Sequence, residues 1–502
     1  MSFRGALASL EAGPADLDAY DDLARASLAE GEEEVALPVL LAAAEKSQAP
    51  LLFQWAGLLR RSIGDHQGAL VSFARAVALA PADAGIAHGH ARIALEAGLP
   101  AIDLFLRARA LAPSDGDVLL GLAAARNAAG DGLAAADELE ELLEQAPGWI
   151  QGHEQLAQLL STLGKKERVG GSLERAIARF PGEAALWSAL FGISLRREDY
   201  TALSEDVSRA RSAGMGPQLL DLYNAIVAAE LDTSLYPKAL FDVAPSLGRE
   251  LGLWRIRHLL RLGAVSEAIG LIDEELASDR KAAVWPYAAI AWRLAGDERS
   301  EWLEGDDRFV KVFDLTSTLP DLGQLAATLR SLHVAKGEYV DQSVRGGTQT
   351  DGPLLSRIDP LIRKLRTAII ASVEEYVRQL PKEDFSHPLL SKRRDRRVRF
   401  SGSWSVKLRA GGRHANHVHP QGWISSALYI SLPPKDLAER QDAGWFTLGE
   451  PQEELKIPLE PRRKIQPHAG HLVLFPSWMW HGTVPFSKGE RLTVAFDVSP
   501  PI

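Results

Sequence analysis

The sequence contains no cysteine and no long uninterrupted run of apolar residues. The absence of cysteine excludes disulfide bonds, iron–sulfur clusters, thiolate-bound zinc and a cysteine nucleophile. A metal site in this chain must therefore use histidine and carboxylate ligands. No stretch approaches the roughly 18 apolar residues of a membrane-spanning helix, and the N-terminal residues lack the apolar core of a signal peptide. We therefore expect a cytoplasmic protein that does not bind a membrane.

Basic residues are fewer than acidic residues. Fifty-six Lys and Arg residues face 66 Asp and Glu residues, which gives a net charge of −10 at pH 7. A negative chain is repelled by a phosphate backbone, so we do not expect a nucleic-acid partner. The apolar fraction of 46% and the charged fraction of 24% are typical of folded globular proteins. A chain of 502 residues exceeds what one hydrophobic core usually organises, so two or more domains are expected.

A repeat marked by proline runs through the first part of the chain. Five prolines lie 31, 32, 34 and 34 residues apart: Pro50, Pro81, Pro113, Pro147 and Pro181. At fixed offsets before them stand small residues such as Ala76 and Ala108, and large apolar residues such as Phe73 and Phe105. Small residues let two helices approach closely, large ones fill the groove of the next repeat, and proline stops the second helix. The pattern predicts a solenoid of helical hairpins.

Glycine marks the turn inside each predicted hairpin. Gly64, Gly98, Gly130 and Gly164 recur at spacings of 34, 32 and 34 residues. Glycine readily adopts the left-handed conformation that joins paired helices. The period and these residues resemble tetratricopeptide repeats, although the Trp and Tyr positions of that consensus are only partly kept. An Ala-rich helical bundle without true repeats is the alternative. We expect the repeats to cover residues 1–303.

After about residue 300 the pattern becomes one of short strands. Helices are expected at 319–332 and 360–380, and strands are expected at 308–315, 400–409, 423–432, 444–448, 472–475 and 491–498. The Gly-Gly pair in residues 345–350 predicts a tight turn. Short strands that follow one another suggest a β-sandwich or barrel, so residues 304–502 are expected to form a second domain.

Histidine is concentrated in this second part of the chain, where six of the 13 histidines lie between residues 414 and 481. His417 and His419 are two residues apart in an extended stretch, so their side chains project to the same side and can reach one metal ion. His481, at the end of another apolar strand, could supply the third ligand. The other three histidines of this stretch are interpreted as surface residues of loops near glycine: His414, His468 and His471.

An arginine follows the third histidine. Arg491 lies ten residues after His481 and opens a strand in which Arg491 and Thr493 share one face. A guanidinium on the inner wall of a barrel needs an anion, and arginine pairs bidentately with carboxylates, to which Thr493 could add a hydroxyl donor. Tyr429 could also donate to such a ligand, although a packing role is an equally good interpretation. A dicarboxylic co-substrate would fit.

The order of these residues resembles that of double-stranded β-helix oxygenases that use iron(II) and 2-oxoglutarate. The closer likeness is to bacterial proteins that join tetratricopeptide repeats to such a domain. It is carried by the segments SVRGGTQTDG (343–352), RFSGSWSVKL (399–408), NHVHPQGWISSALYISLP (416–433), HLVLFPSWMWHG (471–482) and RLTVAFDV (491–498).

The resemblance implies a multidomain fold, in which an all-α tetratricopeptide-like solenoid precedes a double-stranded β-helix (jelly-roll) domain with flanking helices. It implies iron(II) held by His417, His419 and His481, molecular oxygen, and 2-oxoglutarate as co-substrate, with the far carboxylate on Arg491 and Thr493. It implies no catalytic residue beyond the ligands of the metal and the co-substrate.

One departure from this family concerns His419. Oxygenases of this class usually present two histidines and one carboxylate to iron, but His419 stands where Asp or Glu is expected. Three neutral imidazoles leave the iron site more positive by one charge than the usual ligand set. Imidazole also binds zinc, copper and nickel, so the ligands alone do not identify the metal.

Three hypotheses about function remain open at this stage. The first is a dioxygenase that hydroxylates a protein or peptide recruited by the concave surface of the repeats. The second is a non-catalytic tetratricopeptide adaptor with a degenerate metal-binding barrel. The third is a three-histidine dioxygenase that does not use 2-oxoglutarate, against which Arg491 argues. In addition, the basic run at residues 392–397 predicts either a solvated loop or a surface that attracts an acidic peptide or a phosphate group.

Overall fold

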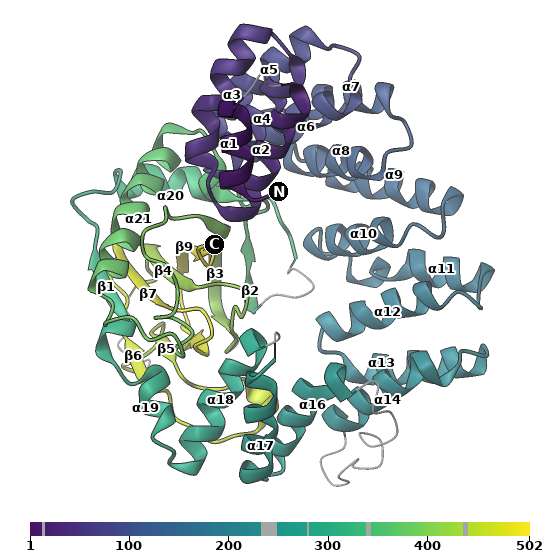
Figure 1. The fold of residues 1–502 in the computed structure, drawn as a ribbon. Coiled ribbons are helices and arrows are strands. Elements are labelled where there is room, and N and C mark those ends of the chain that lie inside the picture. Colours follow the sequence, from purple (N-terminus) through teal and green to yellow (C-terminus); the bar gives the residue numbers. More distant parts are fainter. Residues whose placement is uncertain (13–15, 232–247, 279–280, 338–342, 435–439) are drawn as a thin grey trace.

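Helices dominate the described residues up to about residue 300, and two antiparallel sheets with flanking helices and loops follow them. The computed structural model describes residues 1–12, 16–231, 248–278, 281–337, 343–434 and 440–502. A curved solenoid of helices partly encloses two antiparallel sheets, which lie on its inner side (Figure 1). This architecture confirms the predicted fold class. Among the described residues, no helix has the length and apolar character that a membrane crossing requires.

The solenoid consists of helices that pack against their neighbours in the sequence. Their bounds are α1 (Phe3–Ala12), α2 (Leu17–Glu30), α3 (Glu33–Ser47), α4 (Pro50–Ser62), α5 (His66–Leu79), α6 (Ala84–Glu96), α7 (Ile102–Leu111), α8 (Gly116–Ala128), α9 (Gly132–Gln145), α10 (Ile150–Thr162), α11 (Gly171–Arg179), α12 (Ala184–Arg196), α13 (Tyr200–Ser212), α14 (Pro217–Leu231), α16 (Gly248–Arg261), α17 (Val265–Leu276), α18 (Lys281–Ala295) and α19 (Arg299–Glu304). Two further helices flank the sheets: α20 (Leu322–Ser331) and α21 (Pro360–Gln379).

The repeat pattern predicted these hairpins correctly. Four of the prolines follow the last residue of a helix by two positions: Pro81, Pro113, Pro147 and Pro181. Phe73 and Phe105 are almost fully buried, each with 1% of its surface exposed. A Cβ on Gly121 would lie 2.1 Å from the ring of Phe105, so the close packing of the two helices requires glycine there. The large residues of the repeat are therefore buried and the small ones allow close helix packing, as their spacing predicts.

The turn glycines adopt the left-handed conformation that the sequence predicts. Gly64, Gly98, Gly130 and Gly164 have φ angles of 76°, 78°, 96° and 74°. The next position in this series, 34 residues after Gly164, is Glu198, which has a φ angle of 54°. Left-handed backbone costs a residue with a Cβ about 1 kcal/mol more than it costs glycine. The α12–α13 turn therefore carries a glutamate in a conformation that favours glycine.

The strands of the C-terminal part form two antiparallel sheets. Their bounds are β1 (Lys311–Asp314), β2 (Val344–Gln349), β3 (Phe400–His414), β4 (Ile424–Ser431), β5 (Phe446–Leu448), β6 (Arg463–Ile465), β7 (His471–Pro476), β8 (His481–Thr483) and β9 (Glu490–Val498). The larger sheet has the order β1-β7-β4-β9-β3-β2, and the smaller has the order β6-β5-β8. The six strands predicted from the sequence all have counterparts among these.

The prediction of a tight turn at residues 345–350 is wrong. These residues belong to β2, which pairs with β3, and the register shifts between Arg345 and Gly347. Gly346 has a φ angle of 69°, and a Cβ on it would lie 3.0 Å from the Cα of Gly412. The Gly-Gly pair therefore serves a β-bulge within a strand. Strands β6 and β8 were not predicted, because three residues are too few for alternation to be recognised and, unlike the equally short β5, they are not rich in apolar residues.

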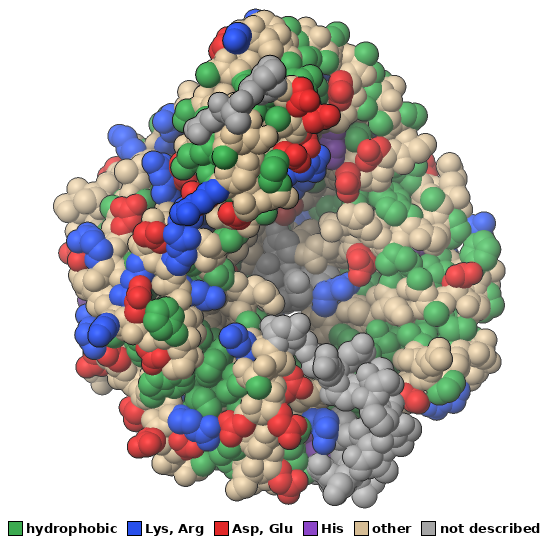
Figure 2. Space-filling view, viewed as in Figure 1, with side chains coloured by type: hydrophobic (Ala, Val, Ile, Leu, Met, Phe, Trp, Pro, Cys, Tyr) green, Lys and Arg blue, Asp and Glu red, His purple; other side chains and the backbone are tan. Residues whose placement is uncertain are grey.

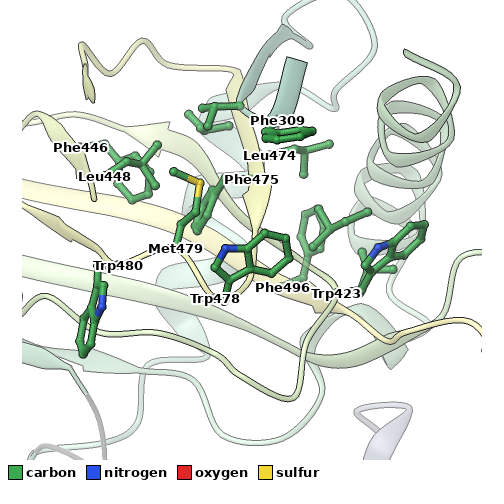
Figure 3. Packing of buried hydrophobic residues seen from close by; sticks show 14 of the residues in the cluster. Phe309, Trp423, Phe446, Leu448, Leu474, Phe475, Trp478, Met479, Trp480 and Phe496 are labelled. Carbon is green, nitrogen blue, oxygen red and sulfur yellow. The ribbon is translucent and has the colours of Figure 1, made fainter. Parts of the chain in front are cut away.

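One hydrophobic core joins the last helices of the solenoid to the sheets, and it extends from Ile256 to Val498. The indole of Trp480 donates to the carbonyl oxygen of Pro286 on α18 at 2.9 Å, and its ring lies 5.7 Å from that of Tyr287. Figure 3 shows Trp480 beside the other aromatic residues of this core. The core crosses the predicted boundary between residues 303 and 304, and that boundary stays a prediction.

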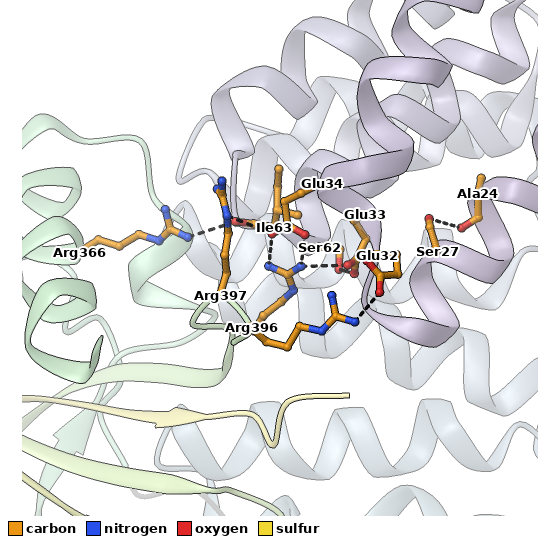
Figure 4. Close-up of polar contacts among 11 residues, drawn as sticks. Ala24, Ser27, Glu32, Glu33, Glu34, Ser62, Ile63, Arg366, Arg396 and Arg397 are labelled. Carbon is orange, nitrogen blue, oxygen red and sulfur yellow. Dashed lines mark hydrogen bonds and ion pairs between the residues drawn. The ribbon is translucent and has the colours of Figure 1, made fainter. Parts of the chain in front are cut away.

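Ion pairs hold the first helices of the solenoid against the sheets (Figure 4). Arg396 pairs with Glu32, and the guanidinium of Arg399 binds Glu33 and Glu34, both at 2.9 Å. Only 3% of the surface of Glu33 is exposed. The basic run at residues 392–397 thus supplies a contact within the chain, which neither interpretation of that run predicted.

Arg399→Ala is expected to lower the free energy of unfolding by about 2 kcal/mol, because it leaves the buried Glu33 without its cation. Urea unfolding followed by circular dichroism measures the change. Arg393→Ala is the matched control, since Arg393 pairs with the exposed neighbouring Asp395 and should change stability by less than about 0.5 kcal/mol. Equal effects of the two substitutions would show that the contact between the parts contributes no stability.

Residues that follow α20, together with the start of α21, contact the inner turns of the solenoid in the reverse order of the hairpins. Hydrogen bonds join Gly337 to Thr162, Asp351 to Asn127, Ile358 to Ala97, and Arg366 of α21 to Ile63. These contacts involve the hairpins that turn at Gly164, Gly130, Gly98 and Gly64. The inner side of the solenoid therefore faces the sheets, and the space-filling view shows the molecule hollowed between them (Figure 2).

Candidate metal centre

The structure brings His417, His419 and His481 together where the two sheets face each other. One ring nitrogen of each histidine lies within 4.8 Å of the corresponding nitrogens of the other two. His417 and His481 form an antiparallel bridge in which each backbone N–H donates to the carbonyl oxygen of the other at 3.0 Å. Their ring centres lie 4.1 Å apart. The three residues that were selected as metal ligands are thus neighbours in space.

Hydrogen bonds at Nδ1 orient all three imidazoles. The acceptors are the carbonyl oxygen of Ala415 for His417 at 2.8 Å, that of Met479 for His481 at 2.9 Å, and Oδ2 of Asp497 for His419 at 2.6 Å. A neutral imidazole whose Nδ1–H donates keeps the lone pair on Nε2, where a metal can bind it. Each ring therefore keeps its Nε2 lone pair for a metal, and Nε2 of His417 also lies 3.1 Å from the hydroxyl of Ser343, which lines the same cavity.

The surroundings favour the neutral form of the half-buried His417 and the buried His481. The removal of its imidazole from water is the main cause that lowers the pKa of His417 to about 3. Burial also places the pKa of His481 well below its usual value. The neutral imidazole is the form that binds a metal ion. Three such nitrogens on one side of an ion leave its other coordination positions open to further ligands.

A buried cation lies in the same cavity. Only 1% of the surface of Arg491 is exposed, and its Nη1 donates to the carbonyl oxygen of Gly444 at 3.1 Å. Its Nε has no partner among the described residues, and neither has the buried hydroxyl of Tyr429. Unpaired buried charges and hydroxyl groups are costly, and burial lowers the pKa of Arg491. An anion in this cavity would satisfy both groups.

Strand β9 places the selected co-substrate residues on one wall of the cavity, which has a volume of about 410 Å³. Arg491, Thr493 and Ala495 alternate along β9 and line the cavity, as the strand pattern predicts. Thr493 pairs in register with Tyr429 of β4, which also lines it. All six selected residues therefore border the same space.

The sequence was interpreted wrongly at His414, and Asp497 was not selected from it. His414 does not lie in a surface loop: it ends β3, lines the cavity, and has its ring centre 6.0 Å from that of His417. The pairing of β3 with β2 shifts register between Leu408 and Arg413, and residues 409–411 are all exposed, so alternation along β3 does not extend to His414. Asp497 lies two positions after Ala495 on β9, so the alternation that selected Arg491 also places Asp497 on the inner face.

The cavity opens toward the solenoid. Arg196, Arg197 and Glu198, at the turn between α12 and α13, line it together with Arg345 and Glu454 of the C-terminal part. The four preceding hairpins contact Gly337, Asp351, Ile358 and Arg366, whereas this turn borders the cavity. A helical repeat therefore forms part of the wall of the candidate site.

The comparisons with known proteins agree with this location. Residues 402–497 match the family described as "Putative 2OG-Fe(II) oxygenase". The matched segment contains His417, His419, His481, Arg491 and Thr493. No curated protein matches the chain.

Several solved structures are similar to parts of the chain. A prolyl-4-hydroxylase from Pseudomonas putida is 17% identical, with a TM-score of 0.26, and the likeness covers 38% of this chain and 92% of that one. A tetratricopeptide repeat protein from Parabacteroides merdae is 17% identical, with a TM-score of 0.32, over 44% of this chain and 90% of that one. HygX from Streptomyces hygroscopicus, solved with nickel, 2-oxoglutarate and hygromycin B bound, is 12% identical, with a TM-score of 0.26, over 38% and 83%.

Proposed function

We propose that this protein is an iron(II)- and 2-oxoglutarate-dependent dioxygenase that hydroxylates a protein or peptide. One observation carries the proposal: a single cavity contains three convergent imidazoles together with the buried Nε of Arg491 and the buried hydroxyl of Tyr429, which lack hydrogen-bond partners among the described residues. A metal ion would satisfy the imidazoles, and a carboxylate would satisfy the arginine and the tyrosine. The match of residues 402–497 to the oxygenase family supports this pair of ligands.

Each selected residue has a role in this proposal. His417, His419 and His481 would hold iron(II) through Nε2. Arg491 would bind the far carboxylate of 2-oxoglutarate, with hydroxyl groups of Thr493 and Tyr429 as further donors. When bound, iron with 2-oxoglutarate and oxygen supplies the oxidation: one oxygen atom enters a C–H bond of the substrate, and the other enters succinate as carbon dioxide leaves. The protein orients these reactants and limits the access of water.

The buried guanidinium favours this function over the two alternatives. A degenerate barrel in an adaptor would have no reason to keep an unpaired cation and an unpaired hydroxyl inside the protein, where both are destabilising. A three-histidine dioxygenase without 2-oxoglutarate would leave Arg491 without an anion. The proposed co-substrate supplies that anion.

The wall that the repeats contribute supports a macromolecular substrate. Glu198 occupies the turn position at which the four preceding hairpins have glycine, and it lines the cavity. A strained residue at a candidate site is consistent with a role for its side chain there. A substrate segment that enters between this turn and the sheets would contact the repeats and the candidate metal centre at once.

Glu198→Gly is expected to raise the free energy of unfolding by about 1 kcal/mol, because glycine adopts a positive φ angle without strain. Gly130→Ala is the matched control: a Cβ on Gly130 would meet no atom within 4 Å, so only backbone strain should lower its stability, by a similar amount. Urea unfolding measures both. A loss of stability in Glu198→Gly would show that the side chain of Glu198 stabilises the fold instead.

Formation of succinate tests the proposed function. Full-length protein supplied with iron(II), 2-oxoglutarate, ascorbate and oxygen should release succinate slowly even without its substrate. Incubation with peptides that co-purify with the protein should accelerate release and add the mass of one oxygen atom to a peptide. Absence of succinate under all conditions, with zinc retained by the protein, would overturn the proposal.

A further inference from the structure

Asp497 lies directly behind His419 and has both carboxylate oxygens engaged. Its Oδ2 accepts from Nδ1 of His419 at 2.6 Å, and its Oδ1 accepts from the hydroxyl of Ser425 at 2.6 Å. Only 14% of the Asp497 side chain is exposed. A carboxylate that is fixed at both oxygens and shielded from solvent holds its partner in one orientation.

The contacts around Asp497 also fix the backbone of His419. Ser425 pairs in register with Asp497 across β4 and β9, and its hydroxyl lies 2.9 Å from that of Ser477. The backbone N–H of His419 donates to the carbonyl oxygen of Ser477 at 2.9 Å. Trp404 packs beside the imidazole, with 5.7 Å between the ring centres. Backbone and side chain of His419 are therefore both held by the larger sheet and the segment that follows β7.

The three imidazoles differ in the group that accepts the hydrogen bond from Nδ1. His417 and His481 donate to neutral backbone carbonyl groups, whereas His419 donates to a carboxylate. His419 is also the residue that occupies the position where an oxygenase of this kind usually has Asp or Glu. The negative charge that is absent from the three ligands is therefore present one residue further from the metal position.

We propose that Asp497 is a positioning residue of the metal centre, which directs Nε2 of His419 toward the metal and supplies the negative charge that three imidazole ligands lack. This inference rests on the proposed function, because it requires that the histidines bind a metal ion. A histidine that donates to a carboxylate is a more basic ligand than one that donates to a carbonyl group. Its bond to a divalent cation is correspondingly stronger.

Cobalt(II) titration of the full-length, metal-free protein tests this role without relying on turnover. Asp497→Asn keeps the size of the side chain and an acceptor for Nδ1 but removes the charge, and it should weaken cobalt(II) binding about tenfold. Asp497→Ala removes the acceptor as well and should weaken binding about 100-fold. Asp314→Asn is the matched control, since Asp314 lies 3.9 Å from His471 outside the cavity, and it should leave affinity unchanged.

Two further measurements separate positioning from a general effect on folding. Loss of the negative charge should raise the iron(III)/iron(II) reduction potential in Asp497→Asn, which loosened packing alone has no reason to do. Ser425→Ala frees Oδ1 of Asp497 without touching the imidazole and should weaken cobalt(II) binding by a few fold, so the role can be tested even if the Asp497 variants misfold.

The outcomes are distinct. Graded losses of affinity, with the raised potential, support the positioning role. Wild-type affinity in Asp497→Asn and Ser425→Ala, with an unchanged potential, would overturn that role while leaving the proposed function standing. Failure of the wild-type protein to bind cobalt(II) or iron(II) would overturn the proposed function itself.

Discussion

His481→Ala is expected to abolish tight iron(II) binding and, with it, the release of succinate. His481 is 94% buried by its surroundings, with 6% of its surface exposed, and its backbone bridge to His417 holds the two imidazoles side by side. Alanine at position 481 would leave His417 and His419 as the only two of the three proposed ligands. Removal of a group that hydrogen-bonds a metal ligand weakens metal binding about 10- to 100-fold. Removal of the ligand itself should therefore weaken iron(II) binding by more than about 100-fold.

Anaerobic titration with iron(II), followed by measurement of the bound metal, gives the size of this effect. His471→Ala is the matched control, because His471 begins β7 and does not border the cavity. It should bind iron as the wild-type protein does. If His481→Ala kept one equivalent of tightly bound iron, the three-histidine centre would be wrong.

Arg491→Gln is expected to raise the KM for 2-oxoglutarate about 100-fold, since loss of a buried charge pair with a ligand typically costs about 2 to 5 kcal/mol. Iron(II) affinity should change little, because Arg491 does not belong to the histidine cluster. Arg491→Lys keeps the charge but loses the planar pair of donors, so its KM for 2-oxoglutarate should lie between those of the wild-type protein and Arg491→Gln. Succinate formation at varied 2-oxoglutarate concentrations measures the effect.

Arg409→Gln is the control for Arg491. Arg409 lies on the exposed part of β3, opposite Glu490, so its replacement should leave the KM unchanged. Iron-dependent oxygen uptake that needs no 2-oxoglutarate and persists in Arg491→Gln would instead favour a three-histidine dioxygenase. These two results separate the first and third hypotheses about function.

The solenoid could be predicted because its packing rule is local. Glycine, small residues and large apolar residues recur at fixed offsets, and each contact, such as Phe105 against Gly121, joins adjacent repeats. The long strands were predictable for the same reason, since alternation is visible within about five residues. The short strands β6 and β8 and the bulged strand β2 show no such alternation.

The closure of the solenoid around the sheets could not be predicted from local patterns. The contact of Arg399 with Glu33 joins residues that lie 366 positions apart. Nothing in an acidic run or in a basic run specifies that they bind each other. For this reason the basic run was interpreted as a solvated loop or an anion-attracting surface, and the concave side of the repeats was expected to recruit a protein or peptide.

The residues of the candidate site likewise fall into those that a local pattern identifies and those that depend on distant contacts. The i, i+2 spacing of His417 and His419 and the strand face of Arg491 selected residues that the structure brings into one cavity. The partner of His419 was missed, although alternation along β9 pointed to Asp497. The contribution of Glu198 could not be found, because it depends on which hairpin turn borders the cavity.

The central claim is that three histidines without a carboxylate hold iron together with 2-oxoglutarate. A crystal structure of the full-length protein, grown without oxygen in the presence of iron(II) and 2-oxoglutarate, tests it most directly. We predict a metal ion bonded to Nε2 of His417, His419 and His481, with 2-oxoglutarate in contact with the ion and its far carboxylate on Arg491. A metal ion bound without 2-oxoglutarate, with no anion at Arg491, would contradict the claim.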